Sequence, residues 1–415
     1  MAKLSRRDLL LSGAGAAVAA LPRRAGAASS RLRWDAVVVG AGAFGAWTAT
    51  HLRRQGKSVL LVDAWGPAHA RASSGGESRM TRGAYGGDAL YTRMAWDSLP
   101  EWRALSARAG LPIFHSCGVL FVFPDRQPYF EQTLATYRQL GHPIDVYGGA
   151  ALRRRVPAMA FEAGDIALFE PGFGALMARR AVQTLVAEFV AAGGHYQAVA
   201  VRPPVASSER LAHVTAVNGD RIEAERFVFA CGAWLPRVFP HLLRGRIFPT
   251  RQEVFFFAPP PGDARFQAAG LPGWADFNQG DIYYGFPDLE GRGFKIAHDA
   301  HGPPIDPDSG DRTPSAGALA DVRAFMARRF PAMADRPLNE ARVCQYENSS
   351  NGDFLIDVHP HWRNVVLVGA GSGHGFKHAP AVGRYAADLL AGDLASAEPR
   401  FSLATKAETQ HRDVH

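Results

Sequence analysis

The chain has 415 residues, of which 47% are hydrophobic, enough for two or three domains that bury a substantial core. The formal charge is +7, but residues 1–28 carry five basic side chains against one aspartate, which leaves only +3 for the remainder. This balance gives no reason to expect a nucleic-acid partner.

Residues 1–28 are predicted to be an export signal. Arg6 and Arg7 precede an apolar run that ends at Leu21, and Ala25-Gly26-Ala27 resembles a cleavage site. The paired arginines predict a twin-arginine signal, with an ordinary secretory signal as the alternative. The run is too short to span a bilayer, and no other segment approaches that length. We therefore expect a periplasmic or secreted protein with no stable membrane insertion.

Residues 34–63 have the order strand, glycine turn, helix, strand and acid. An apolar run at 36–39 leads into Gly40-Ala41-Gly42-Ala43-Phe44-Gly45, and a second apolar run at 59–62 ends at Asp63. Such glycines permit close backbone approach to a pyrophosphate, which binds at the helix N-terminus, and the acid lies where a ribose ligand is expected. A glycine-rich turn without function is the alternative, but the ordered context favours a dinucleotide site.

The elements that follow change in type along the chain. Residues 64–87 form a predicted loop rich in Gly, Ser and Arg, which has a solvated basic loop as its alternative interpretation. Asn218-Gly219-Asp220 predicts a hairpin, and residues 303–312 a proline-rich loop. Helices are predicted at 91–109, 130–140, 178–192, 316–330 and 381–390. Strands are predicted at 119–123, 227–229, 253–257, 282–286, 294–297 and 365–368.

This pattern predicts an α/β plus α+β fold. The last strand, its glycine turn and the final helix are expected to return to the opening unit, so that a Rossmann-like domain is discontinuous and comprises residues 34–112, 172–245 and 346–392. An antiparallel β-sheet substrate domain is expected from residues 113–171 and 246–345, and residues 393–415 form a tail. The three cysteines, Cys117, Cys231 and Cys344, are an odd number, so at least one thiol is free. No spacing of Cys or His predicts a metal site.

Seven motifs together resemble the flavin amine oxidases of the D-amino-acid oxidase superfamily, and most closely the monomeric sarcosine oxidase and N-methyltryptophan oxidase group. The resemblance extends over nearly all of the chain after the signal. The motifs are residues 40–45, Arg79-Met80-Thr81-Arg82-Gly83-Ala84-Tyr85-Gly86, Ala230-Cys231-Gly232-Ala233-Trp234, Ile282-Tyr283-Tyr284-Gly285-Phe286-Pro287, Gly293-Phe294-Lys295, Val343-Cys344-Gln345-Tyr346 and Ser372-Gly373-His374-Gly375-Phe376-Lys377.

The resemblance implies FAD as the cofactor, which the glycine motif alone does not distinguish from NAD. It also implies a covalent bond between the flavin ring and Cys344, for which a small buried hydrophobe is the alternative. His374 and the glycines around it would approach the flavin pyrimidine through backbone amides. The further residues expected at the cofactor are Ser73, Gly76, Arg79, Met80, Val201, Ala230, Gly232, Trp234, Gly371, Gly373, Gly375, Phe376 and Lys377.

The same resemblance assigns the substrate side. Arg82 and Lys377 would bind a substrate carboxylate, and Arg79 would support the negative charge of the reduced flavin. Lys295 would stabilise negative charge during reaction with O2. Tyr284 and Tyr346 would line the pocket. For each of these cations taken singly, the alternative interpretation is a surface charge or ion pair. For each tyrosine, the alternative is simple packing in or beside the core.

Two residues depart from the family pattern. Asp299 occupies a position where sarcosine oxidases carry histidine, with His298 just before it as a residue that might replace that histidine in the pocket. Glu347 occupies the position of a neutral threonine. The substrate therefore cannot be taken over from sarcosine, and we hypothesise that the added acidity favours an amine with a further cationic or hydroxylated group.

The expected reaction is oxidation of a secondary or N-substituted amino acid. A hydride equivalent passes from the carbon beside nitrogen to flavin N5, water hydrolyses the imine, and O2 is reduced to hydrogen peroxide. One alternative is a dehydrogenase that passes electrons to a quinone or a redox protein. The other is a flavin-binding module without turnover. We expect a monomer.

Overall fold

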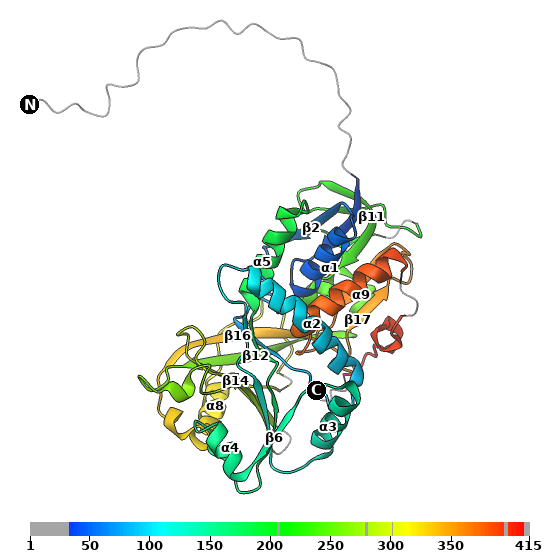
Figure 1. The fold of residues 1–415 in the computed structure, drawn as a ribbon. Coiled ribbons are helices and arrows are strands. Elements are labelled where there is room, and N and C mark those ends of the chain that lie inside the picture. Colours follow the sequence, from blue (N-terminus) through cyan, green and yellow to red (C-terminus); the bar gives the residue numbers. More distant parts are fainter. Residues whose placement is uncertain (1–32, 206–207, 279–280, 301, 394–396, 411–415) are drawn as a thin grey trace, which may run out of the picture. The chain divides into compact units, whose positions relative to one another are not determined.

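A mixed sheet built mainly of parallel strands gathers segments from the whole chain (Figure 1). The computed structural model describes residues 33–205, 208–278, 281–300, 302–393 and 397–410, so the predicted export signal lies outside them. The strand order is β17-β18-β11-β1-β2-β9, with β10 paired to β11. Their bounds are β1 Trp34–Val39, β2 Val59–Asp63, β9 His195–Ala198, β10 His213–Thr215, β11 Arg221–Phe229, β17 Leu355–Val358 and β18 Val365–Gly369.

The register confirms the predicted return of the C-terminal segment. Strand β1 runs parallel to β2 and to β11, and β11 runs parallel to β18. The hairpin around Asn218-Gly219-Asp220 is also confirmed, because it joins the antiparallel pair β10 and β11. The Rossmann-like unit is therefore discontinuous in sequence.

Side chains of β1 alternate between two apolar cores. Ala36 and Val38 pack toward helices α1 (Ala43–Arg54), α5 (Ala178–Ala191) and α9 (Ala379–Ala391). Val37 and Val39 belong to the core on the opposite face, with Phe227. This period-2 burial on both faces explains why β1 is apolar at nearly every position.

The second sheet has the strand order β16-β12-β15-β14-β13-β5-β7-β6. The pairing of β13 with β5 is parallel, whereas the other pairs are antiparallel. The expected antiparallel sheet is thus slightly mixed, because β5 joins from a distant segment and not through a hairpin. The bounds are β5 Val119–Phe123, β6 Asp145–Gly148, β7 Ile166–Glu170, β12 Ile247–Phe257, β13 Gly273–Asn278, β14 Asp281–Phe286, β15 Phe294–His298 and β16 Leu338–Ser349.

A small third sheet and several helices complete the fold. Its order is β3-β8-β4, with β3 Ser78–Thr81, β4 Phe114–His115 and β8 Gly174–Met177. Strand β3 lies in the segment predicted to be a loop, and the sequence pattern does not predict β16. The other helices are α2 Ala89–Arg108, α3 Pro128–Leu140, α4 Gly149–Arg155, α6 Leu235–Val238, α7 Pro240–Leu243 and α8 Ala316–Arg329. The five predicted helices agree with α2, α3, α5, α8 and α9 to within about two residues at each end.

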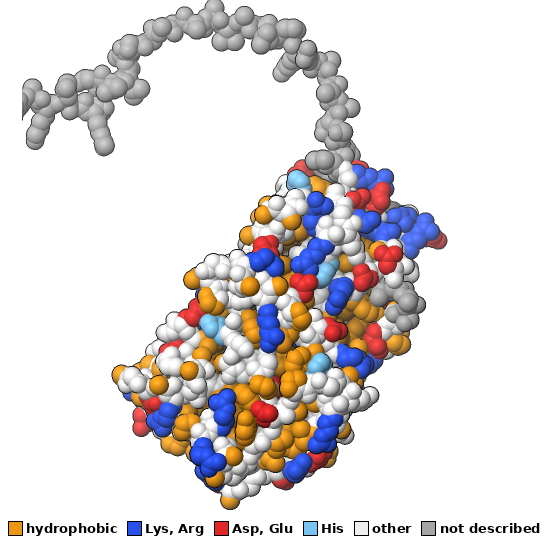
Figure 2. Space-filling view, in the orientation of Figure 1, with side chains coloured by type: hydrophobic (Ala, Val, Ile, Leu, Met, Phe, Trp, Pro, Cys, Tyr) orange, Lys and Arg blue, Asp and Glu red, His pale blue; other side chains and the backbone are white. Residues whose placement is uncertain are grey.

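Figure 2 shows basic and acidic side chains scattered among hydrophobic and other side chains over this face. Among the helices that the structure describes, none combines the length and apolarity needed to cross a membrane.

Candidate active site

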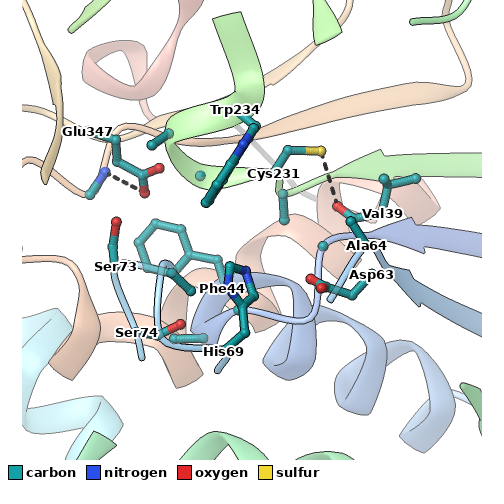
Figure 3. A pocket seen from close by; sticks show the side chains of 18 of the residues that line it. Val39, Phe44, Asp63, Ala64, His69, Ser73, Ser74, Cys231, Trp234 and Glu347 are labelled. Carbon is teal, nitrogen blue, oxygen red and sulfur yellow. Dashed lines mark hydrogen bonds between the residues drawn. The ribbon is translucent and has the colours of Figure 1, made fainter. Parts of the chain in front are cut away.

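A cavity of about 410 Å³ lies at the carboxyl ends of β1 and β2 and continues along three glycine-containing loops. Its lining includes the turn after β1, the loop at 230–234 and the turn at 371–376. Figure 3 shows Glu347 and Asp63 toward opposite ends of this cavity, with Phe44 and Trp234 between them. Ligands of open α/β sheets bind at this edge of the strands. We call this space the first cavity.

The glycines of the opening turn are required by close backbone contacts. Gly40 has a φ of +109°, and a Cβ there would lie 2.3 Å from the Ala230 carbonyl oxygen. A Cβ on Gly45 would lie 1.9 Å from the Gly40 carbonyl oxygen. Helix α1 begins after Gly42, and no side chain caps it. The first amides of α1 are therefore open to an anion such as a pyrophosphate.

Asp63 lines the first cavity and also holds the glycine turn. Its Oδ2 accepts a hydrogen bond of 2.8 Å from the Ala41 amide, and its Oδ1 accepts bonds of 2.9 Å from the Trp65 and Gly66 amides. These donors fix the carboxylate at the end of β2. Its position beside the turn suits a ribose hydroxyl.

Two polar atoms in the first cavity fit a bound ligand. The Ser73 Oγ and the Glu347 Oε2 are buried and have no hydrogen-bond partner among the described residues. Buried polar atoms in native proteins are normally paired, so unpaired ones facing a cavity indicate a ligand that supplies the partner. The residues present fit a dinucleotide such as FAD.

A smaller cavity of about 100 Å³ adjoins the first and is called here the second cavity. Arg79, Tyr346, Gly373 and Phe376 line both. The remaining polar and sulfur-containing lining is Met80, Arg82, Gln252, Tyr284, Asp299, Cys344, Ser372, His374 and Lys377. The apolar lining is Phe121, Val254, Ala275, Phe277 and Ile282.

Arg82 and Lys377 bring two buried basic side chains to the second cavity. The Arg82 guanidinium lies 4.1 Å from the Tyr85 ring centre and donates to the Ala84 carbonyl. Burial acts to lower the pKa of Arg82, but the tyrosines and carboxylates around it, Asp299 among them, raise it above its usual value. Arg82 therefore remains charged.

The Lys377 Nζ donates a 2.8 Å hydrogen bond to the His374 carbonyl and lies 5.0 Å from the Tyr85 ring centre. Burial, and then the neighbouring Arg82, hold the pKa of this amine well below its usual range. A carboxylate bound beside it would favour the charged form. Binding of an anionic substrate and uptake of a proton are thus coupled at Lys377.

Asp299 faces the same cavity as these basic side chains. The Tyr346 hydroxyl donates to its Oδ1 over 3.3 Å. Burial first, and then the charge of Asp299, raise the pKa of Tyr284 to about 12, so this hydroxyl stays a hydrogen-bond donor at neutral pH. The second cavity thus places basic side chains, one carboxylate and two phenols beside a wall of apolar residues.

Arg79 lines both cavities, and Cys344 lines the second. The Arg79 Nη2 donates 2.7 Å to the Ser73 carbonyl, and its Nη1 donates 2.9 Å to the Ser78 carbonyl. Cys344 on β16 is a half-buried free thiol that lines the second cavity. A group that extends from the first cavity into the second would pass Arg79.

Lys295 is buried and lines neither cavity, although it lies near Arg79 and Cys344. Its Nζ donates 2.9 Å to the Ser78 carbonyl. Burial, followed by the charge of Arg79, lowers its pKa to about 7. Its role toward O2 stays a prediction.

His298 does not turn into the pocket. Successive side chains of β15 point to opposite faces of the sheet. The His298 ring stacks on Tyr283 at 4.4 Å, and its Nδ1 lies 3.0 Å from Asp321. The placement of His298 in the pocket is wrong, because its neighbour Asp299 has the inward position.

Glu347 lines the first cavity and not the second, so it adds no acidity to the substrate pocket. Two other predicted residues, Gly45 and Gly76, line neither cavity. Gly45 leaves space for the Gly40 carbonyl, and Gly76 leaves space for the Arg79 guanidinium, because a Cβ on Gly76 would lie 2.6 Å from the Arg79 Nη1. Each glycine therefore affects the cavities through the position of that neighbour.

The other predicted cofactor and pocket residues line one cavity or both. Those in the first are Gly40, Gly42, Ala43, Phe44, Asp63, Ser73, Arg79, Val201, Ala230, Gly232, Trp234, Tyr346, Gly371, Gly373, Gly375 and Phe376. Those in the second are Arg79, Met80, Arg82, Tyr284, Asp299, Cys344, Tyr346, Gly373, His374, Phe376 and Lys377.

Sequence reasoning missed several lining residues. Trp65 and His69 form an aromatic group with Trp234, with Trp65 5.0 Å from Trp234 between ring centres. Trp65 and His69 follow closely after Asp63 in the sequence, so their place beside a predicted ribose ligand could have predicted that they line the cavity. Gln252 and Asp308 came from segments with no motif at all.

A buried hydrogen-bond network that includes Tyr85, His374 and His378 supports the turn at 371–378. The Tyr85 hydroxyl lies 3.0 Å from the His374 Nδ1 and 2.7 Å from the His378 Nε2. The His374 Nε2 is 3.1 Å from the Gly352 carbonyl. The His374 ring is therefore held on both sides, which fixes the backbone amides around it.

The comparisons with known proteins agree with this geometry. The model of the family described as FAD dependent oxidoreductase matches residues 35–389. Monomeric sarcosine oxidase of Bacillus sp. (strain B-0618) is 30% identical over 363 residues, which are 86% of this chain and 92% of the relative. N-methyl-L-tryptophan oxidase of Yersinia pestis (strain Pestoides F) is 28% identical over 368 residues, which are 88% and 96% of the two chains.

A solved structure of L-proline dehydrogenase from P. horikoshii is similar in fold, with a TM-score of 0.78 at 19% identity. The similarity covers 89% of this chain and 97% of the other. Because the family match spans both sheets and both cavities, the chain belongs to the family of FAD-dependent oxidoreductases, with monomeric sarcosine oxidase and N-methyl-L-tryptophan oxidase among its relatives.

Proposed function

We propose that the protein oxidises a secondary or N-substituted amino acid to an imine, with O2 as the electron acceptor. The observation that carries this proposal is the pair of buried basic side chains, Arg82 and Lys377, in a small cavity that adjoins the first cavity. A fixed guanidinium beside an amine that a bound anion would favour in its charged form suits a carboxylate. The names of the relatives, a sarcosine oxidase and an N-methyl-L-tryptophan oxidase, support the same substrate class.

The side chains of the second cavity orient the substrate. Arg82 and Lys377 would hold the carboxylate, and the apolar wall that includes Phe121 and Phe277 would exclude water from the amine side. FAD, when bound, accepts two electrons and the hydrogen from the carbon beside nitrogen. The imine then adds water and releases an amine and a carbonyl product, while two electrons and two protons reduce O2 to hydrogen peroxide.

The test is an amine screen with two readouts. Purified protein is mixed with N-methyl amino acids under air, and peroxide is measured beside reduction of an artificial dye. Peroxide at one equivalent per amine supports an oxidase. Dye reduction with little peroxide indicates a dehydrogenase, and no bleaching of the flavin by any amine without oxygen would leave only a binding module.

Asp299 supports a narrower substrate class. A carboxylate in the second cavity, opposite in charge to Arg82 and Lys377, suits an amine that carries a further cationic or hydroxylated group. Asp299→Asn removes this charge with little change in shape. It is expected to lower kcat/KM at least about tenfold for such amines and to leave N-methylglycine nearly unchanged. An unchanged order of preference would refute the role.

We also propose that Cys344 bonds covalently to the flavin. Its thiol is free and lines the second cavity, two residues before Tyr346, which lines both cavities. After acid precipitation, flavin colour is expected in the pellet of the wild-type protein and in the supernatant of Cys344→Ser. Colour in the wild-type supernatant would refute the bond.

Export by the twin-arginine route is a further proposal, based on Arg6 and Arg7 alone. Replacing both with lysine is expected to retain the protein in the cytoplasm, as measured by cell fractionation. A processed periplasmic product from that variant would indicate an ordinary secretory signal.

A further inference from the structure

Glu347 is a buried carboxyl that faces the first cavity. It lies near the end of β16 and is 8% exposed. Its Oε1 is 3.4 Å from the Gly371 amide, a long and weak hydrogen bond. Its Oε2 has no hydrogen-bond partner in the part of the chain that the structure describes. One side of this carboxyl is therefore left for a ligand.

The carboxyl is held in place by its surroundings. A Cβ on Gly232 would lie 2.9 Å from the Glu347 Oε2, so this glycine leaves the space that the oxygen occupies. The Ser372 amide donates 3.0 Å to the Glu347 carbonyl, which ties β16 to the turn at 371–376. Glu347 thus has little freedom to move out of the first cavity.

The charge state follows from the same surroundings. Burial raises the pKa of Glu347 to about 7, and the Gly371 amide only partly opposes this. No described lysine or arginine contributes to the shift. An ionised carboxylate here would be an unpaired buried charge in a cavity that receives an anionic dinucleotide. A protonated carboxyl instead places an O–H donor at the unpaired oxygen.

We propose that Glu347 binds FAD through its protonated carboxyl, donating a hydrogen bond to an oxygen of the cofactor, so that the affinity for FAD falls when Glu347 ionises. This inference rests on membership of the FAD-dependent family and not on the proposed substrate. It also gives the departure from the family threonine a role at the cofactor. Both threonine and a protonated glutamate supply a neutral O–H donor.

Other ionisable groups line the first cavity, so a pH effect on FAD binding must be shown to come from Glu347 and not from them. They are Asp63, His69, Arg79, Cys231, Arg237, Asp308 and Tyr346. Burial, and then Asp63 and Glu347, raise the pKa of Cys231, which keeps this thiol neutral near pH 7. Burial lowers the pKa of His69, so the His69 side chain is one of the groups that the control must cover. A pH effect that depends on Glu347 must disappear when Glu347 alone is made neutral.

The experiment measures FAD affinity in the Cys344→Ser protein, which holds the cofactor without a covalent bond. Apoprotein is titrated with FAD between pH 6 and pH 8, and binding is followed by quenching of flavin fluorescence. With a free-protein pKa of about 7, the Kd is expected to rise about tenfold over this range. In Cys344→Ser with Glu347→Gln, the Kd is expected to stay constant.

Two further variants complete the design. Glu340→Gln removes an acid from the same strand that lines neither cavity, so it is expected to keep the tenfold change. Glu347→Thr replaces the glutamine variant if circular dichroism shows that the latter does not fold, and it too must lack the pH effect. A constant Kd in the Cys344→Ser parent, an affinity that increases with pH, an equal pH effect in the neutral variants, or no binding at any pH would overturn the proposal.

Discussion

The contact between Gly45 and Gly40 gives a sharp test of the cofactor cradle. In Gly45→Ala, the new Cβ would start 1.9 Å from the Gly40 carbonyl oxygen, whereas an ordinary contact is about 3.4 Å. The opening turn must therefore move by about 1.5 Å away from α1. Overpacking of this kind costs about 1–3 kcal/mol in folding.

The effect on the cofactor is larger than the effect on folding. The same movement displaces the amides that meet the pyrophosphate, and each hydrogen bond to a charged group contributes about 1.5–3 kcal/mol. Loss of two such bonds predicts a decrease in FAD affinity of at least about 100-fold. The Kd is measured by flavin fluorescence in the Cys344→Ser background.

Gly317→Ala is the matched control. Gly317 also lies in a helix, α8, but no atom lies within 4 Å of the position of its Cβ. It is expected to bind FAD normally and to gain up to about 1 kcal/mol in stability, because alanine favours helix over glycine. If Gly45→Ala bound FAD within threefold of its parent, the reasoning from close backbone contact would be refuted.

Three further predictions concern buried ionisable groups. Burial raises the pKa of Glu170 from 4.5 to about 7. The stabilising contribution of this carboxyl is therefore complete below pH 4.5 and is lost as the pH rises to 7. Urea unfolding should show a loss of up to about 3 kcal/mol in the wild type and none in Glu170→Gln. Arg329 donates a hydrogen bond of 2.5 Å to Asp165 and another of 2.5 Å to Asp276, and all three side chains are buried. Arg329→Met should therefore lower the free energy of unfolding by about 3–5 kcal/mol, and a loss below about 1 kcal/mol would contradict this. If Lys295 promotes the reaction with O2, stopped-flow reoxidation should slow as the pH rises through about 7, and Lys295→Met should be about 100-fold slower with no pH dependence; an unchanged rate would exclude this role.

Local patterns were sufficient to predict the elements with a strong period. The apolar run of β1, the glycine turn and α1 follow from residues that are neighbours in sequence, as does the β10–β11 hairpin. Strand β16 was missed because it lies at the edge of the second sheet, where a half-buried strand retains many charged residues. Its twelve residues pair with β12 along nearly their whole length, a long-range contact that no local pattern reports.

The site was harder to predict because the chain brings it together from both ends. Arg82 and Lys377 are almost 300 positions apart, yet both line the second cavity. Their common site was expected from family resemblance and not from spacing. The error at His298 has a simpler cause: a shift of one residue along a strand exchanges the inward and outward faces. The resemblance already assigns Asp299 to the pocket, and a reliable register for β15 would also exclude His298.

Asp299 and Glu347 are both acidic, but they line different cavities and are expected to have different effects. Asp299 faces the second cavity, where a carboxylate changes which amines fit beside Arg82 and Lys377. Glu347 faces the first cavity and does not line the second, and it is proposed to bind the cofactor there. The two departures from the family pattern should therefore act on different quantities: Asp299→Asn on the order of amine preference, and Glu347→Gln on the pH dependence of FAD affinity. Because Tyr346 lines both cavities between them, a change at Tyr346 is expected to affect both quantities at once.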